Sequence, residues 1–237
     1  MKAMILAAGL GTRFKPWTDK HPKALALVNG RSLLERNVMW LQSFGIKEVL
    51  VNVHHFSDQV RDAIIANDGW GSNISISDET GELLETGGGL KKAQGYFDYG
   101  SFVLMNVDIL TDLDLEAMIF FHEEKKPLVT LAVTDRESSR NFLFDHGQRL
   151  AGWRNTKTGE EIISIPGAPL TEKAFSGIHI ISPEIFPLIH RQGKFSIVDV
   201  YLELAALYPI LAFDHSGSKL VDVGRVESVE VAEQLFP

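Results

Sequence analysis

Three cationic side chains, Arg13, Lys15 and Lys23, follow a glycine turn near the start of this 237-residue chain. The turn is Gly9-Leu10-Gly11-Thr12, and it comes directly after the apolar run 4–8. Glycine permits positive φ and close approach of a ligand to the backbone, and successive N–H groups in such a turn form a concave anion site. A strand, a glycine turn and a cationic loop in this order therefore predict a phosphate-binding site.

Two better-known glycine loops fit this segment less well. A Walker A loop needs a glycine followed by Lys and then Ser or Thr, but Gly11 is followed by Thr12 and Arg13. The dinucleotide motif Gly-x-Gly-x-x-Gly matches Gly9 and Gly11 and has Phe14 in place of its third glycine. Because that glycine allows tight helix–strand packing, a nicotinamide oxidoreductase is the weaker alternative. For the two glycines alone, an ordinary tight turn also stays open.

Two aspartates follow apolar strands that are far apart in the sequence. Asp108 comes after the run 102–107, and Asp222 after the run 219–221. An acid at the carboxyl end of a strand in an open α/β sheet lies in the crevice where ligands bind. We therefore expect both carboxylates in one site, whereas Asp112 and Asp114 are expected to serve a loop and a helix cap.

A second glycine segment, Glu85-Thr86-Gly87-Gly88-Gly89, stands before the stretch 90–95, which we expect to be helical. Three consecutive glycines suit the close approach of a flat or charged group. A flexible turn is the alternative interpretation of the same residues.

The elements that must position these residues alternate between strand and helix, which predicts an α/β fold with a mostly parallel sheet. The expected strands are 2–8, 48–53, 73–77, 102–107, 127–134, 173–182, 210–213 and 219–224. The expected helices are 32–45, 57–66, 114–124, 182–189, 198–207 and 226–235. Between residues 136 and 170 the pattern changes to short strands separated by Gly, Asn and Asp. We expect a single domain over residues 1–237, with 136–170 as a small antiparallel insertion.

Composition excludes several classes of function. The net charge of −8 argues against general nucleic-acid binding, although residues 1–23 carry five Lys or Arg and one Asp and are therefore locally +4. No apolar run approaches the ~20 residues of a membrane span, and no signal peptide is expected. The absence of cysteine excludes disulfides and thiolate metal sites and is typical of a cytoplasmic enzyme.

The whole N-terminal string is more specific than its glycines. Its residues Leu6-Ala7-Ala8-Gly9-x-Gly11-Thr12-Arg13, Pro16-x-Thr18 and Pro22-Lys23 resemble the signature loop of the sugar-1-phosphate nucleotidyltransferases. The resemblance implies a Rossmann-like mixed, mostly parallel sheet flanked by helices. It also implies a nucleoside triphosphate, a sugar 1-phosphate and Mg²⁺. The form Leu-Glu-Thr-Gly-Gly-Gly is most similar to the N-acetylmuramate 1-phosphate uridylyltransferases of cell-wall recycling. The C-terminal β-helix of many relatives is not expected here.

The resemblance also implies roles for individual residues. Asp108 and Asp222 would hold Mg²⁺, Arg13 would stabilise the leaving pyrophosphate, and Lys23 would bridge the α-phosphate and the sugar phosphate. Gly11 and Thr12 would hold the β- and γ-phosphates. The remaining expected substrate or nucleotide contacts are Ala7, Ala8, Gly9, Glu85, Gly87, Gly88, Asn106 and Gly177. For a carboxylate on the sugar, the candidate cations are Arg140, Arg154 and Lys173.

The sequence departs from the family pattern at three points. Val107 stands where Gly usually precedes the first aspartate, Leu220 stands where Trp usually precedes the second, and no Glu-Lys-Pro triplet precedes Gly177. Glu172-Lys173 is near that position but lacks the proline.

The expected activity is transfer of a nucleotidyl group, with UTP as the expected donor, to a sugar 1-phosphate by in-line attack on the α-phosphate. Guanylyl transfer to mannose or heptose 1-phosphate and cytidylyl transfer to phosphocholine stay open, as does a non-catalytic sensor of sugar nucleotides. A monomer or small homo-oligomer is expected, with no nucleic-acid or membrane partner.

Overall fold

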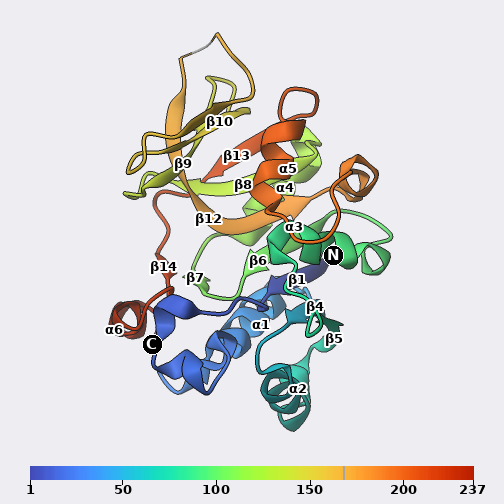
Figure 1. Ribbon diagram of the computed structural model, residues 1–237, viewed down its shortest axis with the longest axis vertical. Helices are drawn as coiled ribbons and strands as arrows, with labels where there is room; N and C mark the ends of the chain where they lie inside the picture. Colours follow the sequence, from blue (N-terminus) through green and yellow to red (C-terminus); the bar gives the residue numbers. More distant parts are fainter. Residues whose placement is uncertain (168) are drawn as a thin grey trace.

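A ten-stranded mixed sheet forms the centre of the molecule, and helices cover both of its faces (Figure 1). The computed structural model describes residues 1–167 and 169–237. Residue 168, which falls within the expected insertion 136–170, lies outside the described residues. The strands of the sheet are β1 (Lys2–Leu6), β4 (Glu48–Val53), β5 (Asn73–Asp78), β6 (Phe102–Asn106), β8 (Val129–Thr134), β9 (Arg140–Phe144), β10 (Leu150–Asn155), β11 (Glu161–Ile163), β12 (Thr171–Ile181) and β13 (Ile210–Asp214).

The strand order is β11-β10-β9-β12-β6-β1-β4-β5, and β8 pairs with both β12 and β13. Strands β5, β4, β1 and β6 are mutually parallel, as the alternation of strands and helices predicted. Strand β12 is antiparallel to β6, β8 and β9. Two short ribbons complete the strands: β2 (Leu27–Val28) with β3 (Arg31–Ser32), and β7 (Ile109–Thr111) with β14 (Leu220–Asp222).

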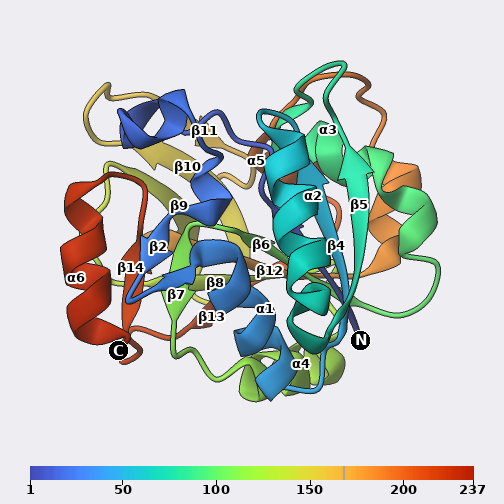
Figure 2. The ribbon, with the colours of Figure 1, turned by 90° about the horizontal axis from the view of Figure 1, so that it is seen from below.

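Side chains alternate between the two faces of each central strand. In β1, Ala3 and Ile5 join one apolar core while Met4 joins the other. The first core contains residues from α1 (Leu33–Ser43) and α2 (Ser57–Ala66), which Figure 2 shows side by side over the sheet. The second contains residues from α3 (Glu85–Lys92) and α5 (Ile197–Leu204). The remaining helices are α4 (Leu115–Lys125) and α6 (Glu227–Leu235), and short 3-10 turns occupy Thr12–Phe14, Trp17–Asp19, Lys23–Leu25, Asp68–Gly71, Gln94–Tyr96 and Pro183–Leu188.

Several strands and helices begin and end at the residues that the sequence predicted. The strand 48–53 and the helix 57–66 have the expected bounds. Helix α4 begins where expected because the Asp114 side chain accepts a hydrogen bond from the Ala117 N–H at 3.0 Å. Such a cap satisfies one of the N–H groups that a helix leaves free at its first turn.

Other expectations need correction. The helix expected at 90–95 begins at Glu85, so the three glycines lie inside α3 instead of before it. The helix expected at 182–189 is a 3-10 segment, Pro183–Leu188, because Pro187 inside it has no N–H for an α-helical bond. The expected antiparallel pairing of the short strands in 136–170 is present, and these strands continue the central sheet through β12.

Within the part of the chain that the structure describes, none of the helices has the length and apolar character needed to cross a membrane.

Candidate active site

The loop after β1 folds back on itself at Gly11, which has a left-handed backbone (φ 60°, ψ 32°). Its carbonyl oxygen accepts hydrogen bonds from the Phe14 N–H at 2.8 Å and from the Thr18 hydroxyl at 2.9 Å. A Cβ atom at Gly11 would lie 2.7 Å from the Thr18 Cγ2 and 3.2 Å from the Lys23 Cβ. Glycine is therefore required here both for its backbone angles and because the loop packs against the segment that carries Lys23.

Lys23 is the cation that this loop places most firmly. Only 9% of the residue is exposed, and its ammonium group forms an ion pair with the Asp108 carboxylate. The Phe14 ring lies beside it, with its centroid 5.8 Å from the Lys23 Nζ. Phe14, which breaks the dinucleotide motif, is 3% exposed and packs in the core under the lysine.

The second aspartate reaches the same place by strand pairing. In the ribbon of β7 and β14, Asp222 pairs with Ile109, and the Val223 N–H donates to the Asp108 carbonyl oxygen at 2.8 Å. Asp112 anchors the other end of the ribbon, because its carboxylate accepts the Lys219 N–H at 2.7 Å. Asp112 therefore has the loop role that the sequence predicted, and it also positions β14.

The electrostatics of Asp222 show which charges surround it. Desolvation by the surrounding protein raises its pKa above the ordinary value, and the Asp108 carboxylate raises it further. Lys23, Arg13 and Arg136 act in the opposite direction. Two carboxylates and three cations thus share one region, as expected of a site that receives both a cation and phosphates.

The donor set suits magnesium. Among residues 1–167 and 169–237, no group of three or more His, Cys, Asp or Glu side chains gathers as a metal site of its own. Asp108 and Asp222 offer hard carboxylate oxygens, and magnesium is usually held by one or two carboxylates together with substrate phosphates. The two aspartates therefore fit Mg²⁺ bound with a substrate and do not form a closed metal cage.

A cavity of about 370 Å³ opens beside the Lys23–Asp108 pair. It brings together seven of the residues that the sequence singled out: Ala7, Ala8, Gly9, Lys23, Glu85, Asn106 and Asp108. Its other walls are Leu6, Asn52, Leu83, Thr86, Val107 and Ser196. Val107, the departure from the family's glycine, is 5% exposed at the edge of this cavity, and its carbonyl oxygen accepts the Asn37 side-chain amide at 2.7 Å.

Gly87 and Gly88 lie outside the residues that line this cavity. A Cβ at Gly87 would stand 2.4 Å from the Phe195 ring, and one at Gly88 would stand 2.2 Å from the Gly193 carbonyl oxygen. Their N–H groups donate to the Phe195 carbonyl at 2.9 and 3.3 Å. The close approach that these glycines permit is therefore to the segment before α5, and the expected nucleotide contacts through them stay predictions.

Gly11, Thr12, Arg13 and Asp222 also lie outside that cavity lining. Arg13 lines a neighbouring hollow together with Arg225, and its guanidinium lies close to Gly224, 3.3 Å from where a Cβ would stand. This hollow also includes Val221, the residue that precedes Asp222.

Gly177 marks a break in the central sheet. The register of β12 with β8 shifts between Phe175 and His179, and Gly177 has a φ of 75°. A Cβ at Gly177 would lie 2.8 Å from the Asn106 side-chain amide. Bulges of this kind re-aim side chains beside active sites, and this one makes room for Asn106 where β6 ends at the cavity.

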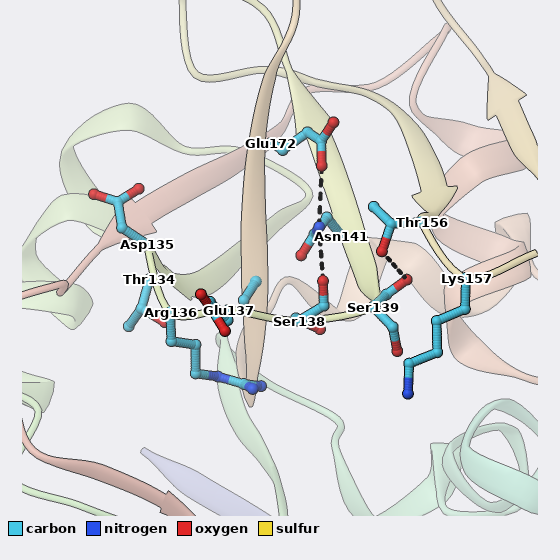
Figure 3. Close-up of a pocket in the computed structure, with 11 residues that line it drawn as sticks. Thr134, Asp135, Arg136, Glu137, Ser138, Ser139, Asn141, Thr156, Lys157 and Glu172 are labelled. Atoms are coloured by element: carbon cyan, nitrogen blue, oxygen red, sulfur yellow. Dashed lines mark hydrogen bonds between the residues drawn. The ribbon is translucent and has the colours of Figure 1, made fainter. Parts of the chain in front are cut away.

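A second cavity, of about 570 Å³, is lined by residues of β12, of the end of β8 and of β9, which pair with opposite edges of β12. Figure 3 shows its lining, with Arg136 and Lys157 both extending away from Glu172. Arg136 donates to the Phe175 carbonyl oxygen at 2.9 Å, and its charge acts on Asp222. Arg136 therefore belongs both to the lining of this cavity and to the charges that act on Asp222.

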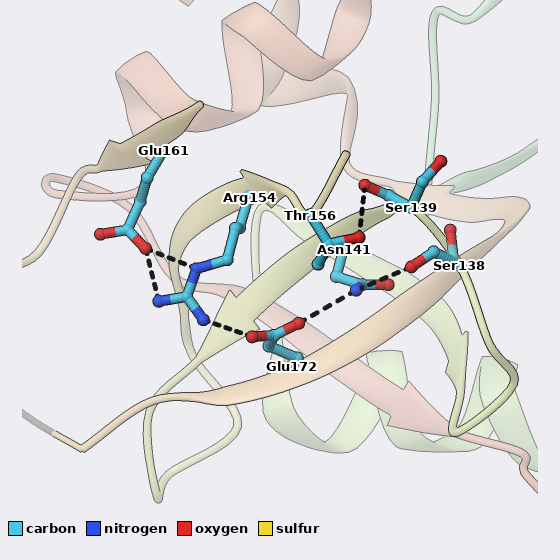
Figure 4. Close-up of polar contacts among 7 residues, drawn as sticks. All are labelled: Ser138, Ser139, Asn141, Arg154, Thr156, Glu161 and Glu172. Carbon is cyan, nitrogen blue, oxygen red and sulfur yellow. Dashed lines mark hydrogen bonds and ion pairs between the residues drawn. The ribbon is translucent and has the colours of Figure 1, made fainter. Parts of the chain in front are cut away.

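The three cations that the sequence proposed for a sugar carboxylate are placed differently. Arg154 stands between Glu161 and Glu172 (Figure 4), and Lys173 stands between Asp135 at 2.6 Å and Asp214 at 2.5 Å. Arg140 is exposed on β9 and is not among the residues lining the second cavity. Each of the first two is thus already neutralised by two carboxylates.

Sequence reasoning missed Asn52, Glu79, Arg136 and Lys157. Asn52 lies between two valines near the end of β4, and Glu79 directly follows β5, so the same rule that selected Asp108 could have selected them. Arg136 and Lys157 lie in exposed turns, where a cation is ordinary and carries no signal of its own.

Comparison with known proteins agrees with this geometry. The family model described as Nucleotidyl transferase matches residues 2–235. An N-acetylmuramate alpha-1-phosphate uridylyltransferase from Caulobacter vibrioides is 34% identical over 212 residues, which cover 86% of this chain and 84% of that protein. A UTP–glucose-1-phosphate uridylyltransferase from Synechocystis is 30% identical over 212 residues, 83% of this chain and 53% of that longer protein.

Solved structures show the same fold. HddC from Yersinia pseudotuberculosis, in complex with GMP-PN, superposes with a TM-score of 0.79 at 23% identity over 100% of this chain and 99% of that one. A UDP-glucose pyrophosphorylase bound to UDP-glucose gives a TM-score of 0.78 at 19% identity, over 98% and 97%. With its family match across nearly its whole length, the chain belongs to the nucleotidyl transferase family, among relatives that are sugar-1-phosphate nucleotidyltransferases.

Proposed function

We propose that the chain joins UTP and a sugar 1-phosphate, foremost N-acetylmuramate 1-phosphate, into a UDP-sugar and pyrophosphate. The observation that carries the proposal is the ion pair of the buried Lys23 with the half-buried Asp108 at the edge of the 370 Å³ cavity, with Asp222 held beside it by strand pairing. This arrangement offers one cation and two carboxylates at the point where a nucleotide in the cavity would present its phosphates.

The reaction balances without a protein base. An oxygen of the sugar phosphate, already an anion, forms a bond to the α-phosphorus of UTP. The bond from that phosphorus to the oxygen bridging to the β-phosphate breaks, and its electron pair leaves on pyrophosphate. Chemistry of this kind requires mainly positioning and charge neutralisation from the protein.

Each residue of the site has a task in this scheme. Lys23 would contact both the α-phosphate and the sugar phosphate, while Arg13, whose charge acts on Asp222, would stabilise the pyrophosphate. Asp108 and Asp222 would hold Mg²⁺, which when bound neutralises phosphate charge. Removing one such preorganised charge typically lowers kcat by ~10²–10³.

The two cavities would divide the substrates between them. The first would receive the nucleoside, because its lining is part apolar and part polar and includes Glu85 and Asn106. The second would receive the sugar, because its lining is mainly polar and charged and includes Arg136, whose charge acts on Asp222. If the sugar carries a carboxylate, Arg136 and Lys157 are the cations that line this cavity.

A guanylyl transferase is the second candidate, since a mannose-1-phosphate guanyltransferase from Yarrowia lipolytica is 27% identical over 229 residues. The test is pyrophosphate release with Mg²⁺, measured for UTP, GTP, CTP, ATP and dTTP against a panel of sugar 1-phosphates. The panel includes N-acetylmuramate 1-phosphate and N-acetylglucosamine 1-phosphate, which differ only in the lactyl ether.

We expect the fastest release with UTP and the muramate. Release with another pair would overturn the proposed substrates, and release with none would overturn the proposed enzyme in favour of a non-catalytic sensor of sugar nucleotides.

A further inference from the structure

A buried amide, which lines the first cavity, faces a buried carboxylate. The Asn52 side-chain N–H donates to the Glu79 Oε1 at 2.8 Å. Asn52 is 2% exposed and Glu79 is 1% exposed. A carboxylate removed this far from water is stable only when its oxygens are hydrogen-bonded, so the pair depends on the partners that surround it.

Each member of the pair holds one wall of the cavity. The Asn52 Oδ1 accepts the N–H groups of Ala7 at 2.7 Å and Ala8 at 3.3 Å. The Glu79 Oε2 accepts the N–H of Leu84 at 3.2 Å. The loop after β1 and the loop before α3 are therefore tied to each other through two side chains, and both loops line the cavity.

The third glycine of α3 makes room for this pair. A Cβ at Gly89 would lie 2.7 Å from the Glu79 Oε1 and 3.0 Å from the Asn52 Nδ2. The His54 ring nitrogen Nδ1 fixes the backbone beneath, at 2.7 Å from the Glu79 carbonyl oxygen. The sequence singled out Gly89 without a function for it, and the structure shows that it admits the Asn52–Glu79 contact.

We propose that Asn52 and Glu79 are a positioning pair that sets the separation and orientation of the two walls between which the nucleobase binds. The proposal rests on the proposed function for its identification of the cavity as the nucleoside site. It also has a consequence for recognition. The N–H groups of Ala7 and Ala8 are already donated to Asn52, so the base must be recognised by other groups of the cavity.

A reciprocal exchange of the two side chains tests the pair. Asn52→Asp alone places two carboxylates face to face, and Glu79→Gln alone offers Leu84 or Asn52 a donor where an acceptor is needed. In the double variant Asn52→Asp/Glu79→Gln, the new amide donates to the new carboxylate. The carboxylate still accepts from Ala7 and Ala8, and the Gln oxygen still accepts from Leu84. All of these hydrogen bonds are thereby restored. Only the bond between positions 52 and 79 has its donor and acceptor exchanged.

Binding of UTP in the presence of Mg²⁺, measured by titration calorimetry, is the first readout because it does not require turnover. Leaving a buried polar group without its hydrogen bond costs a free energy that corresponds to a change of about 10- to 100-fold in an equilibrium constant. We expect each single variant to lose affinity by that factor and the double variant to recover to within about threefold of wild type. In kinetics, the KM for the nucleotide should rise in the single variants while the KM for the sugar phosphate stays unchanged.

A matched pair at the start of β4 and β5 provides the control. Asn73 on β5 donates to Glu48 on β4 at 2.9 Å, but this contact is exposed. Asn73→Asp and Glu48→Gln should leave UTP affinity unchanged. Hydrogen exchange tests the bonds from Ala7 and Ala8 to Asn52 even if no substrate pair reacts. In Asn52→Ala, the amides of Ala7 and Ala8 should exchange at least 10-fold faster than in wild type. The proposal fails if the double variant binds UTP no better than the weaker single variant, or if those amides exchange at the wild-type rate.

Discussion

The backbone N–H of Val223 donates a hydrogen bond to the carbonyl oxygen of Asp108 at 2.8 Å. This single contact explains how two aspartates from distant parts of the chain enter one site. It extends the β7–β14 ribbon by one residue and places Asp222 beside the Asp108 carboxylate that helps to raise its pKa. The ribbon is separate from the central sheet, so the second aspartate is positioned by local pairing with the residues that directly follow the first.

Lys23→Ala should lower kcat by ~10²–10³ while the fold is retained. The lysine is the buried partner of Asp108, and its loss removes the cation that would contact both reacting phosphates. The measurement is steady-state pyrophosphate release beside a circular dichroism spectrum. Lys20→Ala is the control, because Lys20 is exposed and its described contact with Gln59 is through its backbone carbonyl. Near-normal turnover in Lys23→Ala would contradict the assignment.

Much of the fold was predictable because its signals are local. Buried parallel strands appear as continuous apolar runs, and β4 has the expected bounds for that reason. The bounds of α2 follow from the helical spacing of its buried residues Val60 and Ile64. The path of β12 was not predictable in the same way. It includes the bulge at Gly177, where the absence of a Cβ leaves room for Asn106, a residue on another strand.

Gly11→Ala should impair both stability and activity, because it combines two separate effects. A left-handed backbone costs a non-glycine residue about 1–2 kcal/mol, and the new Cβ would also lie 2.7 Å from Thr18 and 3.2 Å from the Lys23 Cβ. Gly30→Ala separates these effects, since Gly30 has a φ of 77° with nothing within 4 Å of its Cβ position. The melting temperature and the turnover rate should both fall for Gly11→Ala. For Gly30→Ala, only the melting temperature should fall. Equal activities of the two variants would show that the Gly11 contacts do not position Lys23.

Lys157→Ala should reduce the preference for N-acetylmuramate 1-phosphate over N-acetylglucosamine 1-phosphate by about fivefold. An exposed ion pair contributes up to about 1 kcal/mol, and this cation lines the second cavity. The measurement is the ratio of kcat/KM for the two sugars. Lys125→Ala, on α4 and remote from the cavity lining, should leave the ratio unchanged. A fall in both kcat/KM values by the same factor would argue against recognition of the carboxylate by Lys157.

The candidate site was partly predictable from the sequence, and the limit has a physical cause. Motif residues such as Lys23 and Asp108 carry a charge at a strand end, and that signal survives without coordinates. Whether a cation is free to bind a substrate leaves no such signal in the sequence. Arg154 and Arg136 are equivalent in type, but only the contacts of Arg154 with Glu161 and Glu172 show that its charge is already neutralised. Partners of this kind come from other strands and have no counterpart in local spacing.

Stability should fall as the pH decreases from about 6.5 toward 4, because three histidines are buried in the neutral form. Burial lowers the pKa of His122 and of His215 to about 4 and that of His179 to about 3. A histidine in the unfolded chain has a pKa of about 6.5. Between these values the unfolded state binds more protons than the folded state, so the free energy of unfolding rises with pH across this window. The slope would approach about 1.4 kcal/mol per pH unit for each histidine, or ~4 for the three together. Asp222, whose pKa is raised, contributes a slope of the opposite sign that is no larger than that of one histidine.

Urea unfolding at pH 7, 6 and 5 measures this slope. His179→Gln replaces a histidine that is 1% exposed and hydrogen-bonded to the Tyr201 hydroxyl at 2.8 Å. The variant should be less stable than wild type at pH 7, because the ring leaves a space in the core, yet its stability should depend less on pH by about one histidine's share. His146→Gln, at an exposed position, should keep the wild-type slope. The two variants differ in whether the replaced ring is buried or exposed. If His179→Gln also keeps the wild-type dependence of stability on pH, protonation of the buried histidines does not drive unfolding.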